Sequence, residues 1–384
     1  MHHKITIAGC GLSGMISALA LASYNIPVTI VEHRSTYDKS FFNDIRTTAI
    51  TASSRKFLDS IGIWSKLQRH IGRIKDIYVV DNKSPNMIHF DSSVVGNGDV
   101  MGFIIENAIF KQSLLELVLE HELITLIDHT PYSIKHNNLD YCTLLLADGT
   151  EMQSDLVILC NGSNSNIKQQ YFSCDVEKSY SQYALTFIVQ HQKSHECTAV
   201  EHFMPNGPFA ILPLRDQNSS SIVWTVKAEM HNALLNLPKE EFLYLVQQNF
   251  GEFLGEISIE SKVASFPLKA QHVRKYFNKR IVLAADSAHV IHPLAGQGLN
   301  QGIKDIDNLI TNIIQYGTNN TALVNYEKSM KPDNIAMFEI TDHLNLLFSN
   351  NSCILRDARK LGFKAIETMP ILKNLLMNYA MGRR

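Results

Sequence analysis

A glycine-rich turn near the start of the chain lies inside a strand, helix and strand pattern. Residues 4–8 are apolar and typical of a buried strand, residues 9–14 spell GCGLSG, and residues 12–24 have the spacing of a helix. A second apolar run at residues 28–31 ends at Glu32. Strand, turn, helix, strand and acid in this order predict a dinucleotide-binding βαβ unit.

Each part of this unit has a physical reason. Gly9 permits the tight turn, Gly11 lets backbone amides approach a pyrophosphate, and Gly14 lets the helix lie close on the strand. Glu32 is then in position to accept the hydroxyls of a ribose. These residues alone do not distinguish NAD from FAD.

A second glycine turn follows another buried run. Residues 281–285 are apolar enough for a strand covered on both faces, and Asp286 falls at its end, where open α/β sheets hold their ligands. Residues 296–298 then lead into an expected helix at residues 299–316. Free amides at that helix N-terminus would point toward an anionic or electron-rich group.

The composition narrows the class of protein. A chain of 384 residues indicates two intimately built domains or one large α/β unit, with 45% hydrophobic and 19% charged residues as in globular enzymes. The net charge of −2 gives no basis for nucleic-acid binding. The six cysteines form no CxxC pair and no disulfide framework, which suits a reducing cytoplasm, and no zinc site is legible. The glycines in the apolar opening argue against a membrane span or signal segment.

The stretch between the two glycine turns contains further candidate elements. Residues 44–58 are expected to form an exposed turn that enters a helix, where Arg46 is either a solvated charge or a guanidinium held near the cofactor. Residues 77–81 and 87–91 predict a hairpin. A helix is predicted at residues 106–121, and Glu106 and Asn107 at its start are expected to face the cofactor.

The pattern then changes twice. Residues 143–153 predict a hairpin and residues 155–160 a buried strand, which Asn161 follows. The strands expected next are short and predict an antiparallel sheet able to hold an apolar ligand against the cofactor, at residues 184–190, 200–204, 209–212 and 222–227. A helix, an extended segment and a helical tail complete the chain, at residues 237–250, 259–268 and beyond 316.

Three motifs together resemble those of the FAD-dependent aromatic hydroxylases with the para-hydroxybenzoate hydroxylase fold, most closely the ubiquinone-biosynthesis hydroxylases. They are GCGLSG with Glu32, DIRTTAITASSRKFLDSIGIW from residue 44, and AADSAHVIHPLAGQGLNQGIKD from residue 284. The segment FMPNGPFAILPL from residue 203 is similar to the substrate-domain strand pair of the ubiquinone branch. The resemblance runs nearly from end to end.

The resemblance implies an α/β (α+β) fold in which a Rossmann-like FAD-binding domain is interleaved with an antiparallel-sheet substrate domain, followed by a helical C-terminus. The FAD-binding domain is expected at residues 1–75, 100–175 and 270–320, and the substrate domain at residues 76–99 and 176–269. The C-terminal helices are expected at residues 321–384.

The resemblance also implies a set of cofactor-binding residues. Gly9, Gly11, Gly14 and Glu32 would bind the ADP half of FAD. Arg46 and Asn107 would lie beside the cofactor, and Asp286 would meet the ribitol chain. The residues expected near the pyrimidine edge of the isoalloxazine are Gly296, Gln297, Gly298, Leu299 and Asn300.

Two positions depart from the family pattern. Asn161 stands where the family usually has aspartate, which leaves the electron donor open because that motif is associated with both flavin and pyridine-nucleotide binding. Ala285 replaces the usual glycine before Asp286, a mild change. Flavin binding is expected to survive both.

The expected activity is that of an FAD-dependent monooxygenase, which places one atom of dioxygen on the aromatic ring of a prenylated phenol in ubiquinone biosynthesis. NADH, NADPH or a reduced electron-transfer protein would supply electrons. No catalytic base is identified, because His202, His289 and His292 are candidates by residue type only and packing roles are favoured for each.

Two other functions and one location stay open. A flavin dehydrogenase or prenyl reductase would use the same fold without oxygen insertion, and a non-catalytic flavin-binding scaffold of a biosynthetic complex would need no base. The tail at residues 354–379 is amphipathic with interspersed basic residues. It predicts either a domain-capping helix pair or a peripheral contact with the inner face of the membrane for a cytoplasmic protein.

Overall fold

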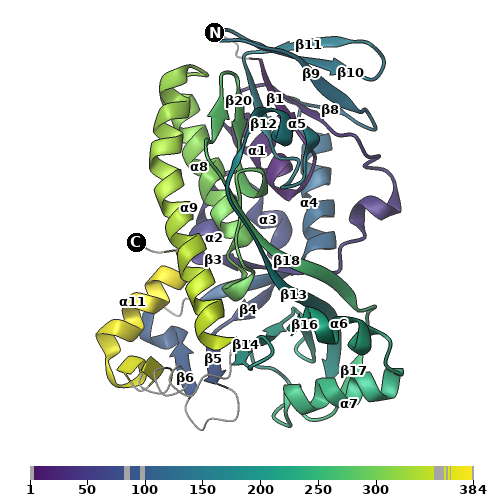
Figure 1. The fold of residues 1–384 in the computed structure, drawn as a ribbon, viewed down its shortest axis with the longest axis vertical. Coiled ribbons are helices and arrows are strands. Elements are labelled where there is room, and N and C mark those ends of the chain that lie inside the picture. The colour runs from purple at the N-terminus through teal and green to yellow at the C-terminus, as the bar shows by residue number, and fades with distance from the viewer. Residues whose placement is uncertain are drawn as a thin grey trace.

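The computed structural model describes residues 4–81, 87–95, 100–349, 359, 362–363 and 365–382. A six-stranded sheet forms the upper part of the molecule (Figure 1). Its four central strands are almost entirely buried and mostly apolar, as expected of a parallel sheet covered on both faces, whereas its two edge strands are partly exposed. In spatial order they are β19 (Phe277–Asn278), β20 (Ile281–Leu283), β12 (Leu156–Leu159), β1 (Ile5–Ala8), β2 (Val28–Val31) and β8 (Ile124–Ile127), and all are parallel except β19.

Helices and two small sheets surround this sheet. The long helices α8 (Gly298–Tyr316) and α9 (Asn320–Phe348) run side by side along it, and α1 (Leu12–Ser23) packs against α8 (Figure 1). The other helices here are α2 (Ala52–Ser60), α3 (Trp64–Leu67), α4 (Asn107–Glu120) and α5 (Asn166–Tyr171). The small sheets are β3 (Thr47–Thr51), β7 (Gly102–Glu106) and β4 (Gly72–Ile74), and β11 (Glu151–Ser154), β10 (Cys142–Leu146) and β9 (Tyr132–Asn137).

A nine-stranded sheet forms the lower part, and its longest strands rise toward the first sheet (Figure 1). Helices α6 (Ala228–Leu235) and α7 (Lys239–Phe250) pack on this sheet, and α7 contributes Phe242, Val246 and Phe250 to a separate core. The strands are β21 (His289–Val290), β18 (Ala264–Val273), β13 (Cys174–His191), β16 (Ser219–Lys227), β15 (Phe209–Pro213), β14 (Thr198–Phe203), β5 (Asp76–Asp81) and β6 (Met87–Asp91), with β17 (Ile257–Ile259) beside β13. All pairings are antiparallel except β14 with β5.

The main elements expected from the sequence are confirmed, with three corrections. The strand expected to be short, at residues 184–190, is the second half of β13, which already begins at Cys174. Residues 44–58 do not pass from a turn straight into a helix, because the β-branched run TTAIT forms strand β3 before α2 begins. Thr51 ends β3 and caps α2, since its Oγ1 accepts a hydrogen bond from the Ser54 amide at 3.3 Å. The strand expected at residues 281–285 ends at Leu283, and Ala285 already belongs to a short 3-10 turn, η3 (Ala285–Ser287).

The remaining short segments include three further 3-10 turns, η1 (Lys39–Phe42), η2 (Ser92–Val95) and η4 (Leu294–Gly296). The tail expected to be helical contains α9 and α11 (Pro370–Ala380), whereas the hairpin turn expected near residue 84 lies outside the described residues. Within the described ranges, no helix combines the length and apolar character needed to cross a bilayer. In the same ranges, no cluster of three or more His, Cys, Asp or Glu side chains is arranged to hold a metal ion.

Candidate active site

The N-terminal glycine turn has the geometry that its sequence predicts. Gly9 has φ +107°, and a Cβ there would lie 2.9 Å from the carbonyl oxygen of Cys160. A Cβ on Gly14 would lie only 1.9 Å from the carbonyl oxygen of Gly9. A Cβ on Gly11 would meet nothing within 4 Å. The turn is therefore closed on the protein side and open at Gly11, as a pyrophosphate cradle requires.

Glu32 lies at the end of β2 as expected, but protein groups already surround its carboxylate. It is 2% exposed and accepts hydrogen bonds from the amides of Cys10 at 2.7 Å and Arg34 at 3.0 Å. The His33 and Arg34 side chains lie 3.0 and 3.3 Å from Oε1, and both are more than half exposed. A ribose can reach Glu32 once these two exposed side chains turn aside.

Asp44 connects two of the predicted cofactor residues. The Arg46 guanidinium donates to both Asp44 oxygens at 2.8 and 2.6 Å and lies 5.0 Å from the ring centre of Phe266. Asn107 donates from Nδ2 to the same carboxylate at 3.3 Å and accepts from Thr48 at 2.6 Å. The aspartate that the sequence assigns to an exposed turn therefore holds Arg46 and Asn107 together.

The turn after β20 contains Asp286 and a buried network behind it. Asp305 is fully buried and accepts hydrogen bonds from His289 Nε2 at 2.6 Å, the Ala285 amide at 3.1 Å and Asn334 Nδ2 at 2.8 Å. Burial opposes a charged imidazole at His289, but the Asp305 carboxylate outweighs it and raises the pKa of His289. These contacts fix the backbone on either side of Asp286.

Asp286 itself is accessible to solvent. The protein around it still removes enough water to raise the pKa of its carboxyl, against the lowering effect of His289 and Arg46. Arg46 and Asp286 come from segments that are distant in sequence. Their electrostatic coupling supports a single site that includes both.

The second glycine turn packs on β3 and opens helix α8. Gly296 has φ +62°, and a Cβ there would lie 2.9 Å from the Ala49 Cβ. No side chain caps α8, so the backbone amides of its first turn, from Gly298 through Leu299 to Asn300, are available at its N-terminus. Gln297 precedes the helix and lines the large cavity described below.

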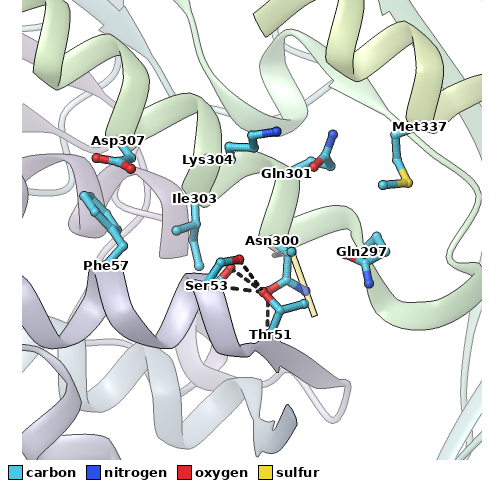
Figure 2. Close-up of a pocket in the computed structure, with 12 residues that line it drawn as sticks. Thr51, Ser53, Phe57, Gln297, Asn300, Gln301, Ile303, Lys304, Asp307 and Met337 are labelled. Atoms are coloured by element: carbon cyan, nitrogen blue, oxygen red, sulfur yellow. Dashed lines mark hydrogen bonds between the residues drawn. The ribbon is translucent and has the colours of Figure 1, made fainter. Parts of the chain in front are cut away.

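The side chain of Asn300 has a structural role in this conformation. Figure 2 shows it directed at Thr51, whose amide donates to Oδ1 at 3.0 Å. Its Nδ2 donates to the carbonyls of Ala49 at 2.8 Å and Gly296 at 3.1 Å. Asn300 thus joins α8 to β3, and only its backbone amide remains for a ligand.

Asn161, the departure from the family pattern, follows β12 beside the first glycine turn. Its Oδ1 is buried and has no hydrogen-bond partner among the described residues. A Cβ on Gly9 would lie 3.0 Å from the Asn161 Cα. An unsatisfied buried acceptor next to the cradle indicates that a donor from outside the chain belongs there.

A cavity of about 540 Å³ extends from these loops along one face of the large sheet. At one end it meets Arg46, Gly296 and Gln297, and its walls are mostly apolar side chains from β14, β15, β16 and β18. Leu376, Met377 and Met381 from the C-terminal segment also line it. The size and lining suit an aromatic ligand with an apolar substituent.

Among the cavity residues, sequence reasoning missed Glu201 on β14. Burial raises the pKa of Glu201 from 4.5 to about 7. The available signal was the alternation in β14, because Ala199 and Phe203, on the same face of the strand, are both buried and apolar. An acid between them had to face the same apolar surroundings.

The three histidines considered from the sequence lie in different environments. His292 lines the cavity, but burial lowers its pKa to about 4 and its Nδ1 accepts from the Leu294 amide at 3.3 Å. His289 is bound to Asp305. His202 is not among the described residues that line the cavity.

The geometry fits an extended dinucleotide such as FAD. Helix α8 packs on α1, the helix that the first glycine turn opens, and a Cβ on Gly302 of α8 would lie 3.8 Å from Ser13 Oγ in that turn. The open cradle at Gly11, the orphaned Asn161 Oδ1 and the uncapped α8 therefore belong to one continuous region. One end offers amides to a pyrophosphate, and the other borders the large cavity.

Comparisons with known proteins agree with this geometry. The family model described as FAD binding domain matches residues 2–332. Ubiquinone hydroxylase UbiL of Rhodospirillum rubrum is 34% identical, over 98% of this chain and 89% of its own. The 3-demethoxyubiquinol 3-hydroxylase of Escherichia coli is 30% identical, over 99% of this chain and 98% of its own.

A solved structure shows the same fold. The p-nitrophenol 4-monooxygenase PnpA of Pseudomonas putida superposes with a TM-score of 0.80 at 14% identity, over 99% of both chains. The matched family covers most of the chain, and two relatives reach 30% identity or more over nearly its whole length. The chain belongs to the FAD-binding family of flavin-dependent monooxygenases, the family that contains the ubiquinone hydroxylases.

Proposed function

We propose that this protein is an FAD-dependent monooxygenase that hydroxylates the ring of a prenylated phenol in ubiquinone biosynthesis. The observation that carries the proposal is the apolar cavity of about 540 Å³ that begins at Arg46, Gly296 and Gln297. A ring at that end is next to the flavin motifs, and the rest of the cavity accommodates an apolar chain. The names of the two sequence relatives agree with this substrate class.

The cofactor residues are assigned within the same proposal. The turn from Gly9 to Gly14 and the Glu32 carboxylate bind the ADP half of FAD, while Asp286 binds the ribitol hydroxyls. Arg46 and Asn107 lie beside the cofactor, held by Asp44. The amides from Gln297 to Asn300 face the pyrimidine edge of the isoalloxazine, where they stabilise negative charge.

The residues of the chain position the substrate ring and exclude water from the reaction site. Bound FAD, once reduced, supplies activated oxygen from dioxygen. The apolar walls from β14, β15, β16 and β18 keep water away from that oxygen and hold the ring beside it. The uncapped N-terminus of α8 stabilises the negative charge that accompanies reduction.

Product analysis with dioxygen labelled in heavy oxygen tests the reaction. We expect purified protein with FAD, a chemical or enzymatic reductant and a soluble short-chain prenylphenol to form a ring-hydroxylated product that carries the label. Oxidised product without the label would favour a dehydrogenase or prenyl reductase. Oxygen consumption no higher than background would favour a non-catalytic scaffold.

Flavin retention tests the cofactor residues. Asp286→Ala and Glu32→Ala are expected to lower the FAD content of purified protein, because each removes an acceptor for sugar hydroxyls. Asp307→Ala is the matched control, since Asp307 is an exposed acid on α8. Unchanged flavin stoichiometry in the Asp286 and Glu32 variants would contradict the assignment.

The electron donor is NADH, NADPH or a reduced electron-transfer protein. Anaerobic mixing with each donor and recording of flavin bleaching separates the three. Bleaching by one pyridine nucleotide at a rate that supports turnover would identify it. Failure of both would point to a protein donor.

A peripheral membrane contact is proposed for helix α11. Ile371 and Leu375 are 86% and 65% exposed on this helix, while Leu376 and Met377 line the cavity from it. The helix therefore connects the cavity with an apolar surface, which is the arrangement a membrane-dissolved substrate requires. The occupant of this surface is the lipid bilayer.

Liposome flotation tests the contact. The double variant Ile371→Ser and Leu375→Ser is expected to reduce binding to anionic vesicles severalfold, because it removes the exposed apolar pair. Leu119→Ser is the matched control, since Leu119 is 51% exposed on α4. Equal binding by all proteins would remove the membrane role. Association with other ubiquinone-biosynthesis proteins is kept as a prediction, to be tested by co-purification at native levels.

A further inference from the structure

Glu201 differs from every other residue that lines the large cavity. Among the described lining residues it is the only acid, and the other titratable groups are Arg46, Lys269 and His292. Arg46 is paired with Asp44, Lys269 is exposed, and His292 accepts a backbone hydrogen bond. Among the residues that the structure describes, Glu201 is therefore the one carboxyl that the cavity offers to a ligand.

The sheet register places Glu201 in an apolar surface. It pairs with Val79 of β5 on one side and with Ala210 of β15 on the other, and Ala210 pairs in turn with Val223 of β16. Residues opposite each other in adjacent strands point to the same face, about 4.8 Å apart. All four line the cavity, so the carboxyl faces it from within an apolar row.

The carboxyl also lacks a partner in the protein. No hydrogen bond or ion pair connects the Glu201 side chain to any described residue, and desolvation is the sole cause of its raised pKa. A carboxyl in such a place costs stability unless a ligand uses it. At neutral pH it is divided between its protonated and ionised forms, the state suited to moving a proton.

We propose that Glu201 accepts the phenolic proton of the substrate while the ring takes up oxygen. This inference rests on the proposed function, since it assumes a phenol beside activated oxygen. A new carbon–oxygen bond forms at the ring, and the phenol O–H bond breaks. Its electron pair stays on the substrate oxygen, and its proton passes to a Glu201 oxygen.

The proton and electron count closes within the established family chemistry. Dioxygen takes up four electrons in all. Two come from the ring, which receives one oxygen atom, and two come from the bound reduced FAD, while the second oxygen atom leaves as water with protons from solvent. The substituted carbon then gives its proton to water, and Glu201 returns its proton to the substrate oxygen. The ring regains aromaticity with one additional hydroxyl, and the Glu201 carboxylate is regenerated.

Glu201→Gln tests this role because it keeps the size and polarity of the side chain but cannot accept a proton. We expect FAD content and substrate affinity to stay within about twofold, while the rate of product formation falls by about 100-fold. Oxygen consumption is expected to become uncoupled from hydroxylation. Glu201→Asp should recover part of the rate.

The pH profile gives a readout that a structural role would not move. In the unmodified protein the rate of hydroxylation is expected to rise with pH and reach a plateau above about 7, as Glu201 ionises. That rise should be absent in Glu201→Gln. Glu177→Gln is the matched control, because Glu177 is an exposed acid on strand β13 of the same sheet.

The outcomes separate this inference from the proposed function. If the unmodified protein forms no labelled product, the proposed function fails first. If it forms labelled product and Glu201→Gln matches it in rate, coupling and pH profile, the role of Glu201 alone is overturned. A loss of rate in Glu177→Gln of the same size would also overturn it.

Discussion

Two acids, the buried Asp305 and the partly buried Glu201, show how differently the two regions of the site are built. Asp305, behind the flavin motifs, has partners for both oxygens, and these partners come from three segments of the chain. Glu201, in the cavity, has none among the described residues. The region behind the flavin motifs holds the backbone in one geometry, and its polar groups hydrogen-bond to one another. The cavity receives a substrate, and it keeps the Glu201 carboxyl available for that ligand.

This difference has an energetic consequence. Removing the Asp305 carboxylate leaves buried donors unpaired, which costs stability. Removing the Glu201 charge relieves a desolvation penalty, which increases stability. The same kind of substitution is therefore expected to have opposite effects in the two regions.

Asp305→Ala is expected to have the largest effect. It leaves His289, Asn334 and the Ala285 amide without their acceptor, and breaking a buried pair of this kind costs about 3–5 kcal/mol. Denaturant unfolding of the FAD-free protein measures the loss directly. FAD content should fall as well, because the turn that contains Asp286 loses its support.

The pH dependence of the Asp305 variant provides a second check. The pKa of His289 is raised in the folded protein, so its contribution to stability is complete below pH 6.5 and is lost as the pH rises through the folded pKa. This loss should disappear in Asp305→Ala. Asp307→Ala, on the same helix but exposed, should change neither quantity by more than about 0.5 kcal/mol.

Glu201→Gln is expected to move stability in the opposite direction. The pKa of Glu201 is raised from 4.5 to about 7, so the folded state binds more protons and stability falls as the pH rises between these values. The amide does not ionise, and the variant should be more stable at pH 8 by up to about 3 kcal/mol. Unfolding curves at pH 4 and pH 8 measure this. A variant less stable than the unmodified protein at pH 8 would contradict the comparison.

Gly302→Ala tests the close packing of α8 on the Asp286 turn. Its Cβ would lie 2.6 Å from the Ala285 Cβ, so we expect a loss of about 1–3 kcal/mol together with weaker FAD binding. Adding Ala285→Gly removes the Cβ with which the new Cβ clashes, and it should recover much of the lost stability and FAD binding. Gly362→Ala is the matched control, because a Cβ there meets nothing within 4 Å. Simple additivity of the two changes would show that the contact is not close.

Ala285→Gly alone is expected to have the smallest effect. Ala285 has φ +55°, a conformation that costs a non-glycine residue about 1–2 kcal/mol. Glycine removes this strain, but it loses more conformational entropy on folding, so the net gain in stability is smaller than the strain. We expect a gain of about 0.5 kcal/mol in thermal or denaturant unfolding. A clear loss would mean that the Ala285 methyl packs favourably against α8. The departure from the family glycine thus carries strain that the sequence does not reveal.

The glycine motifs were predictable because their reasons are local. Gly9 has the left-handed conformation, Gly14 has the close approach and Gly11 leaves the open space that a cradle needs, and their spacing alone indicates it. The strand β3 was missed, because a TTAIT run beside a helix-forming segment has no turn residue to separate them. The cofactor roles of these residues stay predictions until flavin retention is measured.

What the sequence by itself determined is the class of fold, and its motifs predict a dinucleotide-binding site, since both depend on short segments with a fixed order of strand, turn and helix. Tertiary structure decided the rest. Asp44 joins Arg46 to Asn107, Asn300 joins α8 to β3, and Glu201 faces an apolar cavity without a partner. Each of these facts depends on segments distant in sequence. The partners and burial of a polar side chain are set by the packing of such segments, and no local pattern records them.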